Sequence, residues 1–121
     1  PQLQRRTMAK LKPQDELEVR YPRTSNEFKK IQAEQYELFA KKQLDYGPTN
    51  IGMGKAQIEK PKDIAISTLG LVTRMNDKVS RLMNLILNKK DPKNESIEDS
   101  LIDLANYGIM GLIVRRKKWG K

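Results

Sequence analysis

The chain has 121 residues, 37 % hydrophobic and 32 % charged, which is enough for one domain with a single core. It contains no cysteine and no histidine, which excludes disulfides, cysteine zinc sites and a serine–histidine triad. The formal net charge is +9, but residues 1–24 and 115–121 carry nearly all of it, so the body is close to neutral. Any catalysis must therefore use carboxylates, lysine, arginine, tyrosine or a metal held by oxygen ligands.

The first part of the chain predicts an arm and one helix. Residues 1–24 are expected to be extended, because two prolines interrupt them and no apolar period is sustained. Within them residues 1–7 precede a plausible start at Met8 and are expected to have no part in function. A helix is predicted from about Glu27 to Lys42, capped by Ser25 or Asn26. A glycine-rich loop of a dozen or more residues follows, and long loops in small domains are often functional.

The second part predicts two longer helices. Pro61 suits the first turn of a helix from Lys62 to about Leu87, which has a broad apolar stripe. Another helix, capped by Ser96, is expected to run to about Arg116, and residues 117–121 form a basic tail in which Trp119 is exposed. The prediction is therefore an all-α domain over residues 25–116, with three long helices in a small bundle. So few helices are expected to complete their core by pairing with another subunit.

The helix after Ser96 carries the most informative polar residues. Asp99, Asp103 and Asn106 fall at i, i+4 and i+7, so they form one stripe on a helix that becomes apolar after Tyr107. A carboxylate removed from water must be neutralised, paired or bound to a metal. Two interpretations stay open: a metal site, and a buried Asp–Arg network that only holds the bundle together.

Two further polar groups share the body. Glu34 and Glu37 form an E-x-x-E pair. A second group lies opposite the apolar stripe of its helix and consists of Arg74, Asp77, Lys78 and Arg81. Each group alone is also typical of a solvated helix face. Together, carboxylates without histidine or cysteine suit Mg²⁺ or Mn²⁺, and nearby cations suit phosphates. The combination favours metal-dependent nucleotide chemistry without choosing a reaction.

Three segments also carry a family resemblance over roughly residues 25–115. They are Asp45-Tyr46-Gly47, the stretch from Arg74 to Leu82, and the stretch from Glu98 to Tyr107. The chain resembles the nucleotide-modification-associated domain family common in bacteriophages. That family is similar to the all-α nucleoside triphosphate pyrophosphohydrolases of the MazG and dimeric dUTPase type. The pyrophosphohydrolases have a second E-x-x-D pair, whereas this chain has the spacing D-x-x-x-D.

The resemblance implies a helical homo-oligomer, dimer or tetramer, that handles nucleotides with Mg²⁺ or Mn²⁺ in the cytoplasm of an infected bacterial host. It implies metal binding by Glu34, Glu37, Asp99 and Asp103, catalysis by Glu37 and Asp103, phosphate binding by Arg74, Lys78 and Arg81, and nucleotide binding by Asn50, Asn106 and Tyr107.

Three functions are open at this point. The preferred interpretation is a metal-dependent pyrophosphohydrolase-like protein that acts on (deoxy)nucleoside triphosphates. The alternative is a non-catalytic helical module of a phage that binds a nucleotide or a protein. Nucleic-acid binding through the basic ends ranks last, because few aromatic side chains are expected at the surface to stack on bases. No membrane association is expected, since the longest apolar run, 104–114, is shorter than the roughly 20 residues that span a bilayer.

Overall fold

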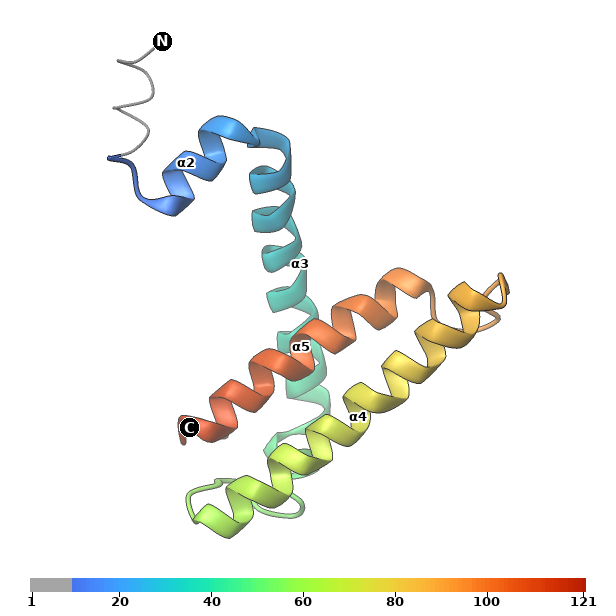
Figure 1. The fold of residues 1–121 in the computed structure, drawn as a ribbon. Helices are drawn as coiled ribbons and strands as arrows, with labels where there is room; N and C mark the ends of the chain where they lie inside the picture. The colour runs from blue at the N-terminus through green and yellow to red at the C-terminus, as the bar shows by residue number, and fades with distance from the viewer. Residues whose placement is uncertain (1–9) are drawn as a thin grey trace. The chain divides into compact units, whose positions relative to one another are not determined.

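The computed structural model describes residues 10–121, which are helical and contain no strand, as the all-α prediction requires. The elements are α2 (Pro13–Arg20), α3 (Pro22–Tyr46), the 3₁₀ turn η1 (Pro48–Asn50), α4 (Pro61–Leu87) and α5 (Ile97–Arg115) (Figure 1). Residues 10–38 belong to one compact unit and residues 39–121 to a second. None of the helices in this part of the chain is long and apolar enough to cross a membrane.

Residues 13–20 were expected to lie in an extended arm but form helix α2. Pro13 begins α2, and the helix has acidic residues in its first turn and Arg20 in its last, an order that the helix dipole favours. The Arg20 Nε lies 3.1 Å from Glu16 Oε1, one helical turn away. Pro22 then begins α3 directly, because proline is tolerated in a first turn. The part of the arm before residue 10 lies outside the described residues.

In the second unit, α4 and α5 lie side by side as a helical hairpin (Figure 1). Their limits agree with the sequence prediction to within about a residue. Pro61 stands at the start of α4, and Ser96 caps α5 through a capping box with Asp99. The α5 face that is buried changes character along the helix: it is polar near the beginning and apolar from Met110 to Val114.

The apolar core occupies the end of the hairpin where α4 begins and α5 ends. Ile58, Leu71 and Val114 are almost completely buried there. Trp119 joins them, with only 2 % of its surface exposed, which corrects the expectation of an exposed side chain in a basic tail. Its indole Nε1 donates a hydrogen bond to the Pro48 carbonyl oxygen at 3.0 Å, so burial leaves the polar atom satisfied.

Gly120 explains how the chain can pack so closely after Trp119. Its φ of +75° lies in the left-handed region, and a Cβ atom there would stand 1.9 Å from the Ala56 carbonyl oxygen. Only glycine fits this approach without moving the backbone. Residues 117–121 are therefore a folded segment held on the loop that precedes α4.

Candidate functional site

The second unit contains a cavity of about 380 Å³ between the end of α3, the η1 segment, α4 and α5. This volume is within the range of small-molecule sites, roughly 300–1,000 Å³. Five residues that the sequence analysis singled out line the cavity: Asn50, Arg74, Asp103, Asn106 and Tyr107. The structure thus gathers residues that lie more than 50 positions apart in the chain around one hollow.

Asp103 is the buried carboxylate of this cavity. It sits on the inner face of α5 and is 7 % exposed. Its Oδ1 lies 2.9 Å from Lys42 Nζ, and its Oδ2 lies 3.0 Å from Lys78 Nζ. Both carboxylate oxygens therefore have an ammonium partner, which answers the cost of removing this charge from water.

Lys78 connects Asp103 with Glu95 in the turn between α4 and α5. Its Nζ lies 2.7 and 2.9 Å from the two Glu95 carboxylate oxygens as well as 3.0 Å from Asp103. Desolvation alone would lower the pKa of Lys78. The hydrogen bonds to Glu95 and Asp103 outweigh desolvation, so its pKa is raised above its ordinary value.

The pKa of Asp103 moves in the opposite direction for the same reason. Burial alone would raise its pKa, because the charged form loses water. Hydrogen bonds with Glu95, Lys42 and Lys78 outweigh burial and hold the pKa of the carboxyl below 3.8. Asp103 is therefore ionised at neutral pH and suited to pairing with cations.

Arg81 holds the two helices of the hairpin together. Its Nη1 donates to the Ser100 hydroxyl at 2.7 Å, and its Nη2 donates to the carbonyl oxygen of Glu95. Ser100 is fully buried on α5, so Arg81 ties α4 to α5 and to the turn that joins them. The predicted phosphate-binding roles of Arg81 and Lys78 stay predictions; both side chains have protein partners here.

Arg74 is the cation of α4 that lies in the cavity. It is half-buried, and its Nη2 donates to the Asn50 carbonyl oxygen at 3.4 Å. Within residues 10–121 Arg74 forms no ion pair with a carboxylate, so its positive charge is not neutralised by a direct partner. A guanidinium in this state is suited to a phosphate or carboxylate of a ligand.

Asp99, one turn before Asp103, has a different environment. It is exposed, its Oδ2 accepts from the Ser96 backbone N–H at 3.3 Å, and its own N–H donates to Ser96 Oγ at 3.0 Å. This reciprocal pair is the capping box of α5. The side chain that was predicted as a metal ligand thus has a role at the helix end.

Glu34 and Glu37 are exposed residues of α3 in the first compact unit, whereas Asp99 and Asp103 belong to the second. In the part of the chain that the structure describes, no three acidic side chains lie close enough together to hold a metal ion. The predicted four-carboxylate metal site stays a prediction.

The sequence reasoning missed several cavity residues at the end of α3. Phe39, Lys42, Gln43 and Tyr46 line the cavity together, at the spacing i, i+3, i+4 and i+7 of one helix face. The sequence contains this spacing, but the predicted helix ended at Lys42, so Gln43 and Tyr46 were not placed on the same helix face. Glu95 gave no comparable signal, because it lies in the turn and meets Lys78 only through the packing of the hairpin.

Cations, side-chain amides and aromatic rings thus line one cavity of a small all-α unit. The family model described as nucleotide modification associated domain 1 matches residues 42–114, more than half of the chain. The protein belongs to this family, and the matched residues lie within the unit that holds the cavity. No curated protein and no solved structure matches the chain.

Proposed function

We propose that the cavity between α3, α4 and α5 binds a nucleotide. The observation that carries this proposal is the meeting of an uncompensated guanidinium, side-chain amides and aromatic rings in one cavity of suitable volume. The family match supports a connection with nucleotides. Each part of a nucleotide has a chemical counterpart among the lining residues.

The phosphate end is assigned to Arg74, with Lys42 as a second cation. Arg74 has no carboxylate partner among residues 10–121, so a phosphate can accept both guanidinium N–H groups of one edge. Lys42 is already paired with Asp103, but half of its side chain is exposed and an ammonium has three donors. The two cations therefore provide net positive charge beside the one ionised carboxylate.

The base and sugar are assigned to the amides and rings. The side-chain amides of Asn50 and Asn106 each contain donor and acceptor atoms, the combination that a nucleobase edge requires. Tyr46 and Tyr107 add aromatic surface, and stacking on such rings is worth about 1–3 kcal/mol for each base. The proposed contacts require no metal.

The test is calorimetric titration with a panel of nucleoside mono-, di- and triphosphates, with and without EDTA. Arg74→Ala should weaken binding roughly tenfold to hundredfold, because hydrogen bonds to a charged group contribute about 1.5–3 kcal/mol. Arg116→Ala is the matched control, since Arg116 is an exposed arginine that does not line the cavity. Equal affinity of the two variants, or no binding by the wild type, would overturn the proposal.

Metal-dependent hydrolysis is a second candidate, favoured by the ionised Asp103 carboxylate in the same cavity. In this reaction water oxygen bonds to the α-phosphorus of a nucleoside triphosphate, and pyrophosphate leaves with the bridging oxygen. Bound Mg²⁺ would supply charge neutralisation on the phosphates. Asp103 fits a metal only if an ammonium gives way, since both of its oxygens are paired with lysines.

Pyrophosphate release from a dNTP panel with Mg²⁺ or Mn²⁺ separates the two functions. The hydrolase proposal expects release by the wild type and background release by Asp103→Asn and Glu37→Gln. Asp77→Asn, an exposed acid of α4 outside the cavity, should retain activity. Tight nucleotide binding with no release and no metal dependence would instead support the non-catalytic module.

A further inference from the structure

The outer side of α4 carries an apolar stripe that the fold leaves exposed. It is formed by Ile66, Leu69, Val72, Asn76, Val79, Met83 and Ile86, and is called the α4 stripe below. Its apolar members are between 40 and 65 % exposed. Among residues 10–121, nineteen large hydrophobic side chains are exposed and nine are buried. Contiguous exposed apolar surface of this kind marks an interaction site.

The spacing of the α4 stripe indicates a helix as its partner. From Leu69 to Ile86 its members alternate steps of three and four residues, which is the seam of paired helices. No charged residue interrupts the seam, although nearly a third of the chain is charged. From Ile66 to Ile86 the seam is about 30 Å long at 1.5 Å per residue.

Four of the six apolar members of the α4 stripe lie symmetrically about Asn76 in the sequence. Leu69 and Met83 are each seven residues from Asn76, and Ile66 and Ile86 are each ten. Two copies of α4 that run antiparallel about a two-fold axis at Asn76 therefore bring Leu69 against Met83 and Ile66 against Ile86. A two-fold interface requires this kind of self-complementary surface.

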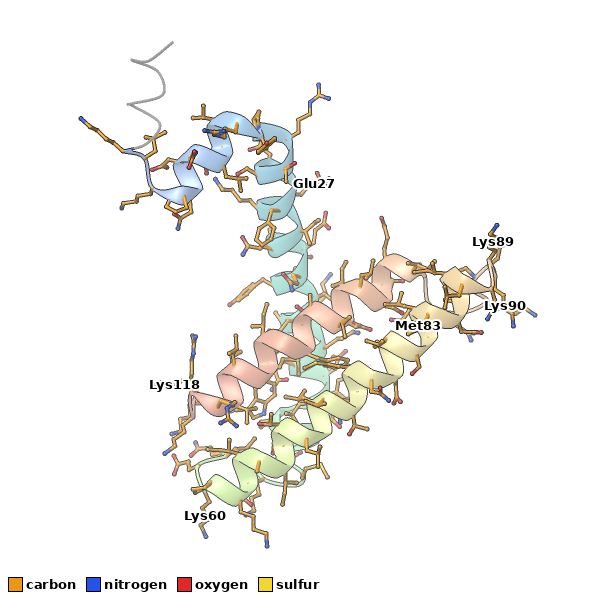
Figure 2. The ribbon with its side chains drawn as sticks, viewed as in Figure 1. Glu27, Lys60, Met83, Lys89, Lys90 and Lys118 are labelled. Carbon is orange, nitrogen blue, oxygen red and sulfur yellow. The ribbon has the colours of Figure 1, made fainter. Side chains whose placement is uncertain are left out.

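The charges at the ends of the hairpin favour the same antiparallel arrangement. Residues 55–63 and 115–121, which meet at one end, contain eight cations and two carboxylates, and Lys121 Nζ pairs with Glu59 at 2.6 Å there. Residues 88–99 at the other end contain three cations and four carboxylates. Figure 2 shows Lys60 and Lys118 at the first end and Lys89 and Lys90 at the second. Antiparallel pairing brings each basic end near a slightly acidic one, whereas parallel pairing would set two basic ends together.

We infer that a second copy of this chain covers the α4 stripe, as an antiparallel helix pair with Asn76 on the two-fold axis. This axis sets the two Asn76 side chains, the one polar member of the stripe, against each other and not against an apolar side chain. The inference does not depend on what the cavity binds.

The mass in solution is the first test, by light scattering after gel filtration and by sedimentation. The wild type should show twice the 14.0 kDa chain mass. Val79→Glu should be monomeric with unchanged helical circular dichroism, because it places a charge in the seam. Leu44→Glu, which changes an exposed apolar residue of α3, should remain dimeric. A monomeric wild type at tens of micromolar overturns the inference.

Engineered cysteines test the direction of pairing, since the chain has no cysteine of its own. Under mild oxidation Asn76→Cys should form a disulfide-linked dimer by itself. Leu69→Cys should form little by itself but cross-link readily when mixed with Met83→Cys. If Leu69→Cys links to itself faster than to Met83→Cys, the pairing is parallel and the inference is wrong. Alkylation of the Leu69→Cys thiol is a further check. If this variant is monomeric and its thiol is still protected from alkylation, the chain's own helices cover the stripe and the inference is wrong.

Discussion

The two halves of the α4–α5 hairpin bury different chemistry. In the half that begins at the turn, Lys78, Glu95 and Asp103 are held by ion pairs and hydrogen bonds. In the half at the open end, Ile58 and Trp119 are held by apolar packing. The turn half thus buries an ion-pair network beside the apolar side chains of Leu82 and Leu85, whereas the main apolar cluster lies in the open half.

The difference between the halves separates stability from binding. Apolar burial contributes free energy in proportion to area and needs no exact partner geometry. A buried ion-pair network gives little net stability, since desolvation offsets the Coulomb attraction, but each of its members is costly to remove alone. We therefore interpret the open half as the main source of stability and the turn half as the part that shapes the cavity.

The strongest test of this interpretation is to remove the largest buried ring of the open half. Trp119→Ala should lower the free energy of unfolding by about 3–5 kcal/mol, the usual range for a buried aromatic side chain. The rings of Trp119 and Phe39 also pack edge to face, with their centroids 6.2 Å apart. The end of α3 should therefore loosen as well. Urea unfolding followed by circular dichroism measures the change.

Two variants control this measurement. Lys118→Ala changes an exposed neighbour and should leave stability within about 0.5 kcal/mol of the wild type. Trp119→Phe keeps most of the packing and loses the hydrogen bond to Pro48, worth about 1 kcal/mol. A loss no larger for Trp119→Ala than for Lys118→Ala would show that the open half is not the main source of stability.

The comparison also shows which features could be predicted from the sequence. The limits of α4 and α5 depend on local signals, a proline at a first turn and the Ser96 capping box, and these were predicted closely. The start of α3 was predicted five residues too late, because Pro22 was interpreted as part of an arm instead of a first helical turn. Prolines and capping residues therefore predict helix limits well when every one of them is taken into account.

Contacts between distant segments were much harder to predict. Trp119 bonds to a residue 71 positions away, and nothing in a basic segment indicates that its tryptophan is buried. Asp99 and Asp103 have the same side chain one turn apart, yet one caps a helix and the other is buried among lysines. The S-x-x-D pattern at Ser96 was a visible signal for the cap. The lysine partners of Asp103 come from α3 and α4 and depend on how these helices pack.

In the turn half we expect a smaller change in the free energy of unfolding, and this change depends on pH. Asp103 has a lowered pKa in the folded protein, so its contribution to stability is fully present above 3.8 and is lost as the pH falls through its folded pKa. Lys78 has a raised pKa, so its contribution is fully present below 10.5 and is lost as the pH rises through its folded pKa. Stability curves from urea unfolding between pH 2 and 11 should therefore fall at both ends.

Asp103→Asn should isolate the acidic end of these curves. At pH 7 it should cost about 2 kcal/mol, less than the roughly 3–5 kcal/mol for breaking a fully buried pair, because the Lys42 partner is half exposed. The gap to the wild type should narrow as the pH falls through the lowered pKa of Asp103 in the folded protein, because the wild-type carboxyl then also loses its charge. Glu98→Gln, an exposed acid on the same helix, should follow the wild-type curve. A constant gap at every pH would mean that Asp103 stabilises the hairpin by its shape and not by its charge, and the contrast between the two halves would then be one of packing alone.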